Sequence, residues 1–165
     1  MSVRITVVNH ADVEIACPPA SVWRDMLEAF VHGASLDRQG YRTAPLMEDP
    51  AALLGGYRVS LQDAQGQSTD VLIVRITERD DDAMRLGLWV EYLEPAVLAQ
   101  VVHTGCQAVV VACGTRYYTY THSTFNVNPS ARDDVAGAAA AFKRTTAASL
   151  DERLAAMKAR LEKLA

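Results

Sequence analysis

The pattern of apolar and polar residues changes its period close to the amino terminus. Between Val3 and Ile15 the two kinds of residue alternate loosely, which predicts a first strand with an irregularity near Asn9–His10. The Cys-Pro-Pro sequence that follows ends this strand, because proline cannot donate a hydrogen bond to a sheet. Apolar residues then recur every three or four positions from Ala20 to Val31. This spacing predicts a short amphipathic helix, which Pro19 can open at its first turn.

The middle of the chain returns to alternation and predicts a series of antiparallel strands. Residues 33–49 are polar and irregular, and Gly55–Gly56 turn the chain into the next strand. Residues 94–105 leave two readings open, a short helix or an extended segment. The β-branched pair Val101–Val102 is compatible with a strand, and we favour the extended segment. The predicted strands are residues 57–62, 69–78, 84–92, 107–113 and 115–126.

The register predicted for the last hairpin separates an inner face from an outer one. Pairing of Ala112 with Thr115 places alternate residues of the final strand on opposite sides. One side is uncharged, whereas the other carries Arg116 and His122. We therefore assign the uncharged side to the interior. Its residues on the final strand are Tyr117, Thr119, Thr121 and Phe125.

One long helix is predicted for the end of the chain. From Ser130 to Ala165 there is no proline, and Gly137 is the one glycine. The small residues of 137–141 would let this helix lie close to a sheet or over a pocket, with Phe142 as the bulky exception. A later apolar stripe lasts about two heptads, which is short for a coiled coil, so packing on a sheet is the favoured interpretation. The stripe consists of Leu150, Leu154, Met157, Leu161 and Leu164.

Composition bounds the class of protein. The 165 residues are 50% apolar and 22% charged, which predicts a single globular domain over 1–165. A net charge of -4 without any basic run disfavours nucleic-acid binding. No apolar run reaches the roughly 20 residues that a membrane span needs, and the first residues do not resemble a signal peptide. Three cysteines without CxxC spacing fit a reducing compartment, so we expect a cytoplasmic protein.

Sequence motifs of common catalytic sites are missing from the chain. It contains no G-x-S-x-G, HExxH, P-loop or dinucleotide-binding fingerprint. The four histidines are scattered, with no pair at the spacing that a helical metal site requires. The acidic residues 80–82 are typical of a turn rather than a calcium loop, because no further ligand spacing follows. We therefore predict no metal and no cofactor.

Four segments resemble the helix-grip superfamily known as SRPBCC or START-like, which includes the Bet v 1-like pollen allergens. ADVEIACPPASVWRDML resembles the first strand entering the first helix, and GGYRVSL resembles the glycine-led second strand. CGTRYYTYT is similar to the turn into the last strand, and ASLDERLAAMKARLEKL to the closing helix. The resemblance implies an α+β fold. A curved antiparallel sheet of about six to seven strands, with a short helix or two after strand 1, would wrap around the long C-terminal helix.

The resemblance also implies a function, the binding or transport of a hydrophobic small molecule such as a lipid, a polyketide or an aromatic compound. A curved sheet that one helix cannot fill would enclose a mainly apolar cavity. The alternative is that the same residues pack as a filled core. The predicted lining residues are Tyr57, Val59, Leu72, Val74, Leu86, Leu88, Tyr117, Thr119, Thr121 and Phe142.

Two other functions stay open. The first is a metal-free enzyme similar to the polyketide aromatase/cyclases, with proton transfer by groups inside the cavity. Its candidate residues are Tyr117, Tyr118, Tyr120 and His122. The second is an interaction module similar to the Hsp90-activator proteins of the superfamily. In that case the leucine stripe would dock a partner or a second copy, as in a homodimer.

Overall fold

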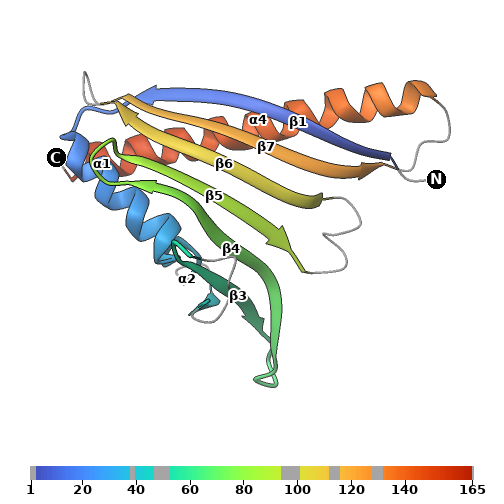
Figure 1. The fold of residues 1–165 in the computed structure, drawn as a ribbon, viewed down its shortest axis with the longest axis horizontal. Coiled ribbons are helices and arrows are strands. Elements are labelled where there is room, and N and C mark those ends of the chain that lie inside the picture. Colours follow the sequence, from blue (N-terminus) through green and yellow to red (C-terminus); the bar gives the residue numbers. More distant parts are fainter. Residues whose placement is uncertain are drawn as a thin grey trace.

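The fold consists of one antiparallel sheet of seven strands and a long helix that crosses it (Figure 1). A computed structural model describes residues 3–37, 40–46, 53–93, 101–111, 116–127 and 132–164. The strands are ordered β1-β7-β6-β5-β4-β3-β2 across the sheet. Their bounds are β1 (Val3–Glu14), β2 (Tyr41–Pro45), β3 (Gly56–Gln62), β4 (Ser68–Asp80), β5 (Arg85–Tyr92), β6 (Val101–Val111) and β7 (Arg116–Val127).

The helices lie at the two ends of the sequence. A short helical region follows β1, and the long helix α4 closes the chain and runs along β1 and β7 (Figure 1). Their bounds are α1 (Pro19–Met26), η1 (Leu27–Val31), α2 (Ala34–Asp37) and α4 (Arg132–Glu162). The arrangement confirms the predicted α+β helix-grip fold, with a seven-stranded sheet around a C-terminal helix.

The prediction of an irregularity in the first strand is wrong. β1 pairs with β7 without any shift of register, from Val3 opposite Val127 to Glu14 opposite Arg116. Asn9 keeps its place in the alternation and is buried. Its amide nitrogen donates to Thr146 Oγ1 at 2.7 Å. A polar residue at an inward position, rather than a bulge, therefore accounts for the break in the apolar pattern.

The segment predicted to be irregular, residues 33–49, contains regular structure. It forms α2 and the edge strand β2, which pairs with β3. The strand is only five residues long and ends at Pro45, which a sheet tolerates at its edge. So short and polar a strand carries little periodicity. Residues 47–52 of this region lie outside the described residues.

The remaining predictions of secondary structure agree closely with the structure. Val101 to Val111 is a strand, as the favoured reading of 94–105 predicts, while 94–100 lie outside the described residues. β6 and β7 have the predicted register, with Val110 opposite Tyr117 and Gly105 opposite His122. Residues 112–115, where the turn of this hairpin was predicted, also lie outside the described residues. The first helix spans the predicted range, but its last turn is the π-helix η1.

Two irregularities in β4 bend the sheet. Its pairing with β3 shifts between Val59 and Ser60, and its pairing with β5 shifts between Ile76 and Glu78. Bulges of this kind increase the local twist and bend of a strand. Gly87 lies opposite the second bulge, where an added Cβ would be 2.8 Å from Thr77 Oγ1. Glycine therefore lets the bulged strand approach its neighbour closely.

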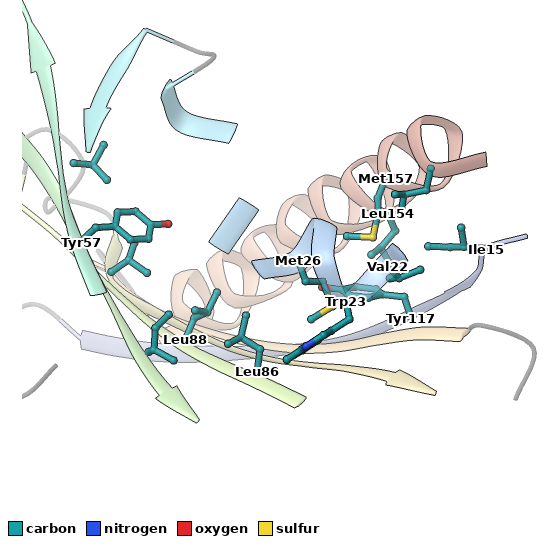
Figure 2. Packing of buried hydrophobic residues seen from close by; sticks show 14 of the residues in the cluster. Ile15, Val22, Trp23, Met26, Tyr57, Leu86, Leu88, Tyr117, Leu154 and Met157 are labelled. Carbon is teal, nitrogen blue, oxygen red and sulfur yellow. The ribbon is translucent and has the colours of Figure 1, made fainter. Parts of the chain in front are cut away.

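The apolar core lies where α1 and the C-terminal half of α4 meet the sheet. Val22 and Met26 of α1 are fully buried, and Figure 2 shows them between Leu154 and Met157 of α4 and the strands. Of the leucine-spaced stripe, Leu164 is 79% exposed, whereas the other four residues are buried. The stripe therefore packs within the chain, as the favoured interpretation predicts, and is not a free coiled-coil surface. The buried four are Leu150, Leu154, Met157 and Leu161.

Charged side chains attach the end of α4 to the start of the chain. Glu162 Oε1 accepts a hydrogen bond from the Ala16 backbone N–H at 2.8 Å and one from Lys158 Nζ at 2.7 Å. Lys158 Nζ also donates to the Glu14 carbonyl oxygen. The hydrogen bond from Lys158, followed by that from Ala16, lowers the pKa of Glu162 from its ordinary value of 4.5. Arg160 forms an ion pair with Asp25 of α1.

A second contact fixes α1 at the opposite side. Trp23 Nε1 donates to Asp81 Oδ1 at 3.2 Å, so the predicted turn at 80–82 also holds the helix. Asp81 accepts hydrogen bonds from Arg79 as well, and these are the main cause of its lowered pKa. The helix α1 is thus tied to both α4 and the β4–β5 turn.

The core position of Leu86 generates the first prediction. Leu86 is fully buried, so Leu86→Ala should lower the free energy of unfolding by about 2–5 kcal/mol through lost burial and a cavity. Urea unfolding followed by circular dichroism measures this. Leu61→Ala, at a strand leucine that is 49% exposed, is the control and should cost less than about 1 kcal/mol. Equal losses in the two variants would contradict the described packing.

The Glu162 contacts generate a prediction about pH. Because the folded-state pKa of Glu162 is lowered, its stabilising effect is complete above the ordinary value of 4.5 and is lost as pH falls through the folded-state pKa. Glu162→Gln should therefore be less stable than the native protein near neutral pH. The difference should shrink as pH falls below about 4.5. Urea unfolding across a pH series measures it.

Glu152→Gln is the matched control for this experiment, since Glu152 is an exposed glutamate of the same helix. Its difference from the native protein should stay small at every pH. If the two glutamine variants lose stability in parallel, the contacts of Glu162 do not stabilise the end of α4.

Candidate ligand-binding face

The inner face of the sheet is the side that α1 and α4 cover. Residues that are paired across neighbouring strands form rows that run across this face. One row passes from Asn9 to Thr121 and on to Leu88, and the next passes from Val7 to Ser123 and on to Val90. A third places Tyr92 opposite Leu72. The face therefore combines polar positions on β1 and β7 with apolar positions on β4 and β5.

The inner face has two halves that differ in how completely they are covered. Between α1 and the strands, side chains such as Met26 of α1 and Leu86 of β5 are fully buried. Farther along the strands, Leu72 and Val90 are only half-buried, although they pack against the core cluster and Val59 and Val74, their cross-strand neighbours, are buried. We call this second region the open half, and it comprises Leu72, Val90, Tyr92, Thr121, Ser123 and Phe142. Thr121 and Ser123 are buried at its β7 side, whereas the other four keep contact with solvent.

Two of the described contacts join the N-terminal half of α4 to the sheet. The rings of Phe142 and Phe125 stack with centroids 4.1 Å apart and planes 7° apart. One helical turn later, Thr146 Oγ1 accepts from Asn9 and donates to the Phe142 carbonyl oxygen at 2.7 Å. An added Cβ at Gly137 would meet no atom within 4 Å. Close packing at Gly137 is therefore not the reason for the small-residue stretch.

The ten residues predicted to line a cavity lie on the inner face or on α4 above it, but they differ in burial. Six belong to the apolar core, namely Tyr57, Val59, Val74, Leu86, Leu88 and Tyr117. Thr119 and Thr121 are buried polar residues of β7. Leu72 and Phe142 are half-buried and belong to the open half. Their contact with a ligand remains a prediction.

Four residues of this region were not among the predicted lining set. Val90 and Tyr92 continue the alternation of Leu86 and Leu88, so their face was predictable although their half-buried state was not. Ser123 follows Thr121 by two positions and shares its face. Asn9 was not predicted to face inward, because the sequence around it was interpreted as an irregularity in the strand. The alternation of β1 is the signal that could have placed Asn9 inside.

Two of the four residues considered for an enzyme, Tyr118 and His122, lie on the outer face. The His122 ring covers Gly105, where an added Cβ would clash with the ring, and the centroids of the His122 and Trp89 rings are 5.9 Å apart. Tyr118 is exposed, and its hydroxyl is hydrogen-bonded to His10 Nδ1. The Tyr120 side chain lies outside the described part of the structure. Tyr117 is on the inner face and is buried.

The open half is uncharged at every described position. None of its residues is an acid, a histidine, a lysine or an arginine. Among the described residues there is also no group of three or more histidine, cysteine or acidic side chains that could hold a metal ion. Neither α4 nor any other described helix has the length and apolarity that crossing a membrane requires. Shape and hydrogen bonding are therefore what this face offers.

Comparison with solved structures identifies the fold. The protein Ara h 8.0201 superposes with a TM-score of 0.54 at 10% identity, over 98% of this chain and 97% of that protein. Norcoclaurine synthase from Thalictrum flavum matches with a TM-score of 0.53 at 15% identity, over 98% and 94% of the two chains. The Zhui aromatase/cyclase from Streptomyces sp. R1128 matches with a TM-score of 0.55 at 15% identity, over 97% and 94%.

The chain therefore has the Bet v 1-like helix-grip fold that the four sequence segments predicted. At 10–15% identity these similarities establish the fold and not the activity. No protein-family model matches the sequence, and no curated protein matches it. The function has to be argued from the site.

The hydrogen bond between Asn9 and Thr146 generates a prediction for the helix over the open half. Thr146→Val removes the acceptor and leaves the buried Asn9 amide unpaired, which should cost about 1–3 kcal/mol of stability. Asn9→Leu combined with Thr146→Val should cost less than the sum of the two single changes. Chemical denaturation of the four proteins measures this coupling.

Thr145→Val is the matched control, because Thr145 is an exposed residue of the same helical turn. It should change stability by less than about 0.5 kcal/mol. Additive losses in the double variant would show that the two side chains do not interact in solution.

Proposed function

We propose that the protein binds a hydrophobic small molecule at the open half of the inner face and acts as a carrier or sensor. The ligand class is a lipid, a polyketide or an aromatic compound. One observation carries the proposal. Large apolar side chains of β4, β5 and α4 keep contact with solvent on a face that is otherwise the interior of the fold. They are Leu72, Val90, Tyr92 and Phe142.

The energetics of such binding are adequate. Burying apolar surface contributes about 25 cal/mol per Å². A ligand that removes about 300 Å² from water would therefore gain about 7–8 kcal/mol before the costs of association. Micromolar binding corresponds to about 8 kcal/mol, so a ligand of moderate size can reach this range only if it also covers protein surface. The half-buried side chains supply that surface.

The structural comparisons support a ligand of this class without deciding it. Norcoclaurine synthase is described in complex with dopamine and hydroxybenzaldehyde, in a structure that superposes with a TM-score of 0.52 at 14% identity. The fold therefore accommodates aromatic molecules in at least one protein. The Zhui protein is an aromatase/cyclase. Since the same fold serves enzymes, the side chains of this chain must decide between binding and catalysis.

The chemistry of the open half favours binding over catalysis. A cyclase-like mechanism needs a group that transfers protons inside the site. Among the described positions of the open half, Tyr92 carries the one ionisable side chain, so no second ionisable group is there to exchange a proton with it. His122 and Tyr118, which would complete such a mechanism, lie on the outer face. The described side chains therefore support ligand binding better than they support a cyclase-like enzyme.

The interaction-module reading also loses its main feature. Its partner was expected to dock on the leucine-spaced stripe of α4. Four of those five residues are buried against the protein's own core, and Leu164 remains exposed. A second copy would have to use another surface, so we do not propose a homodimer through the stripe.

The proposal is tested with a fluorescent apolar probe, 1-anilinonaphthalene-8-sulfonate. The native protein should bind it with micromolar affinity and a rise in fluorescence. Val90→Phe places a larger side chain in the open half and should weaken binding at least fivefold while the protein remains folded by circular dichroism. Titration of fluorescence against protein concentration measures the change.

Thr69→Phe is the matched control, because it adds the same side chain at an exposed position of β4. Its affinity should equal that of the native protein. The proposal fails if the native protein does not bind the probe, or if both phenylalanine variants bind it as tightly as the native protein does.

A further inference from the structure

We propose that the ligand is amphipathic and that an oxygen-bearing group of the ligand is hydrogen-bonded by Thr121 at the β7 side of the open half. This inference rests on the proposed function and narrows its ligand class. Alcohols, phenols and carbonyl compounds of moderate length fit it, whereas pure hydrocarbons do not. Three buried polar side chains, Asn9, Thr121 and Ser123, lie at this side of the inner face.

Polar side chains gather at one side of the inner face. Asn9 is 6% exposed, Thr121 8% and Ser123 7%, and Asn9 is directly opposite Thr121 in the β1–β7 pairing. Burying a hydroxyl or an amide is unfavourable unless it finds a hydrogen-bond partner. Valine has nearly the shape of threonine and would avoid that cost at a simple core position. The partners of these three groups therefore indicate what this region does.

Two of the three groups are already occupied within the protein. The Asn9 amide donates to Thr146, which joins β1 to α4. Ser123 also has an interaction partner. These contacts organise the region but leave Thr121 to be explained.

The Thr121 hydroxyl is the group that can bind a ligand. It has no hydrogen-bond partner among the residues that the structure describes. Among all the residues that the structure describes, however, every fully buried side-chain oxygen or nitrogen has a hydrogen-bond partner. The Thr121 oxygen is therefore not sealed in the core and borders on space that solvent can enter. A hydroxyl can both donate and accept, so it suits alcohol, phenol and carbonyl groups alike.

The register also indicates where the apolar part of the ligand lies. Thr121 shares its row with Leu88, and the next row holds Ser123 and Val90. Neighbouring strands are about 4.8 Å apart, so β5 lies about 10 Å from β7 across β6. A molecule of about that length would place its polar end at Thr121 and its apolar body against Val90 and Tyr92. The two ends of the site thus differ in chemistry.

The test compares two probes of the same shape, 2-naphthol and 2-methylnaphthalene. Thr121→Val removes the hydroxyl and should weaken 2-naphthol binding about fivefold to tenfold, the value of one hydrogen bond. Binding of 2-methylnaphthalene should be unchanged or slightly tighter. Thr121→Ser keeps the hydroxyl and should retain the preference for 2-naphthol. Probe fluorescence in titrations measures all affinities, and thermal unfolding confirms that each variant is folded.

Thr69→Val is the control, because Thr69 is an exposed threonine of β4. It should leave both affinities unchanged. If Thr121→Val changes the two affinities equally, or changes neither, the role of Thr121 is overturned while the proposed binding function stands. If neither probe binds the native protein, the proposed function fails, and the inference fails with it.

Discussion

The pairing of β1 with β7 is the constraint on which the rest of the structure depends. It joins the first and last strands over twelve residues without a break in register. Because the two strands are antiparallel, the helices that follow them, α1 and α4, start at opposite ends of this pair and cover the same face of the sheet. The core between them and the polar row on β1 and β7 both result from this single pairing.

The inner face has a chemical gradient across the strands. The β4 and β5 side is apolar, whereas the β1 and β7 side contains buried amide and hydroxyl groups. A filled core would need no such division, because Asn9 and Thr121 could be replaced by apolar residues of similar size. Under α1 the face is sealed like any core. The gradient extends into the open half, where Thr121 and Ser123 lie on the β7 side and Val90 and Tyr92 on the β5 side.

Sequence alone predicted what depends on local alternation and missed what depends on distant contacts. Tyr117 and Thr119 were placed inside because Arg116 and His122 mark the opposite face of their strand, and the register confirms this. β2 was missed because five edge residues carry too little periodicity. The half-buried state of Val90 could not be predicted, since it depends on where α4 lies over the sheet.

The attachment of α4 is uneven along its length, and this has a consequence for its dynamics. Its C-terminal half is fixed by the buried stripe and by the ionic contacts of Lys158, Arg160 and Glu162. In its N-terminal half, the described side-chain contacts with the sheet include the stacked rings of Phe142 and Phe125 and the hydrogen bond from Asn9 to Thr146. Local opening free energy follows the density of such contacts. We therefore expect backbone amides near Phe142 to exchange with solvent through smaller fluctuations than those near Leu154.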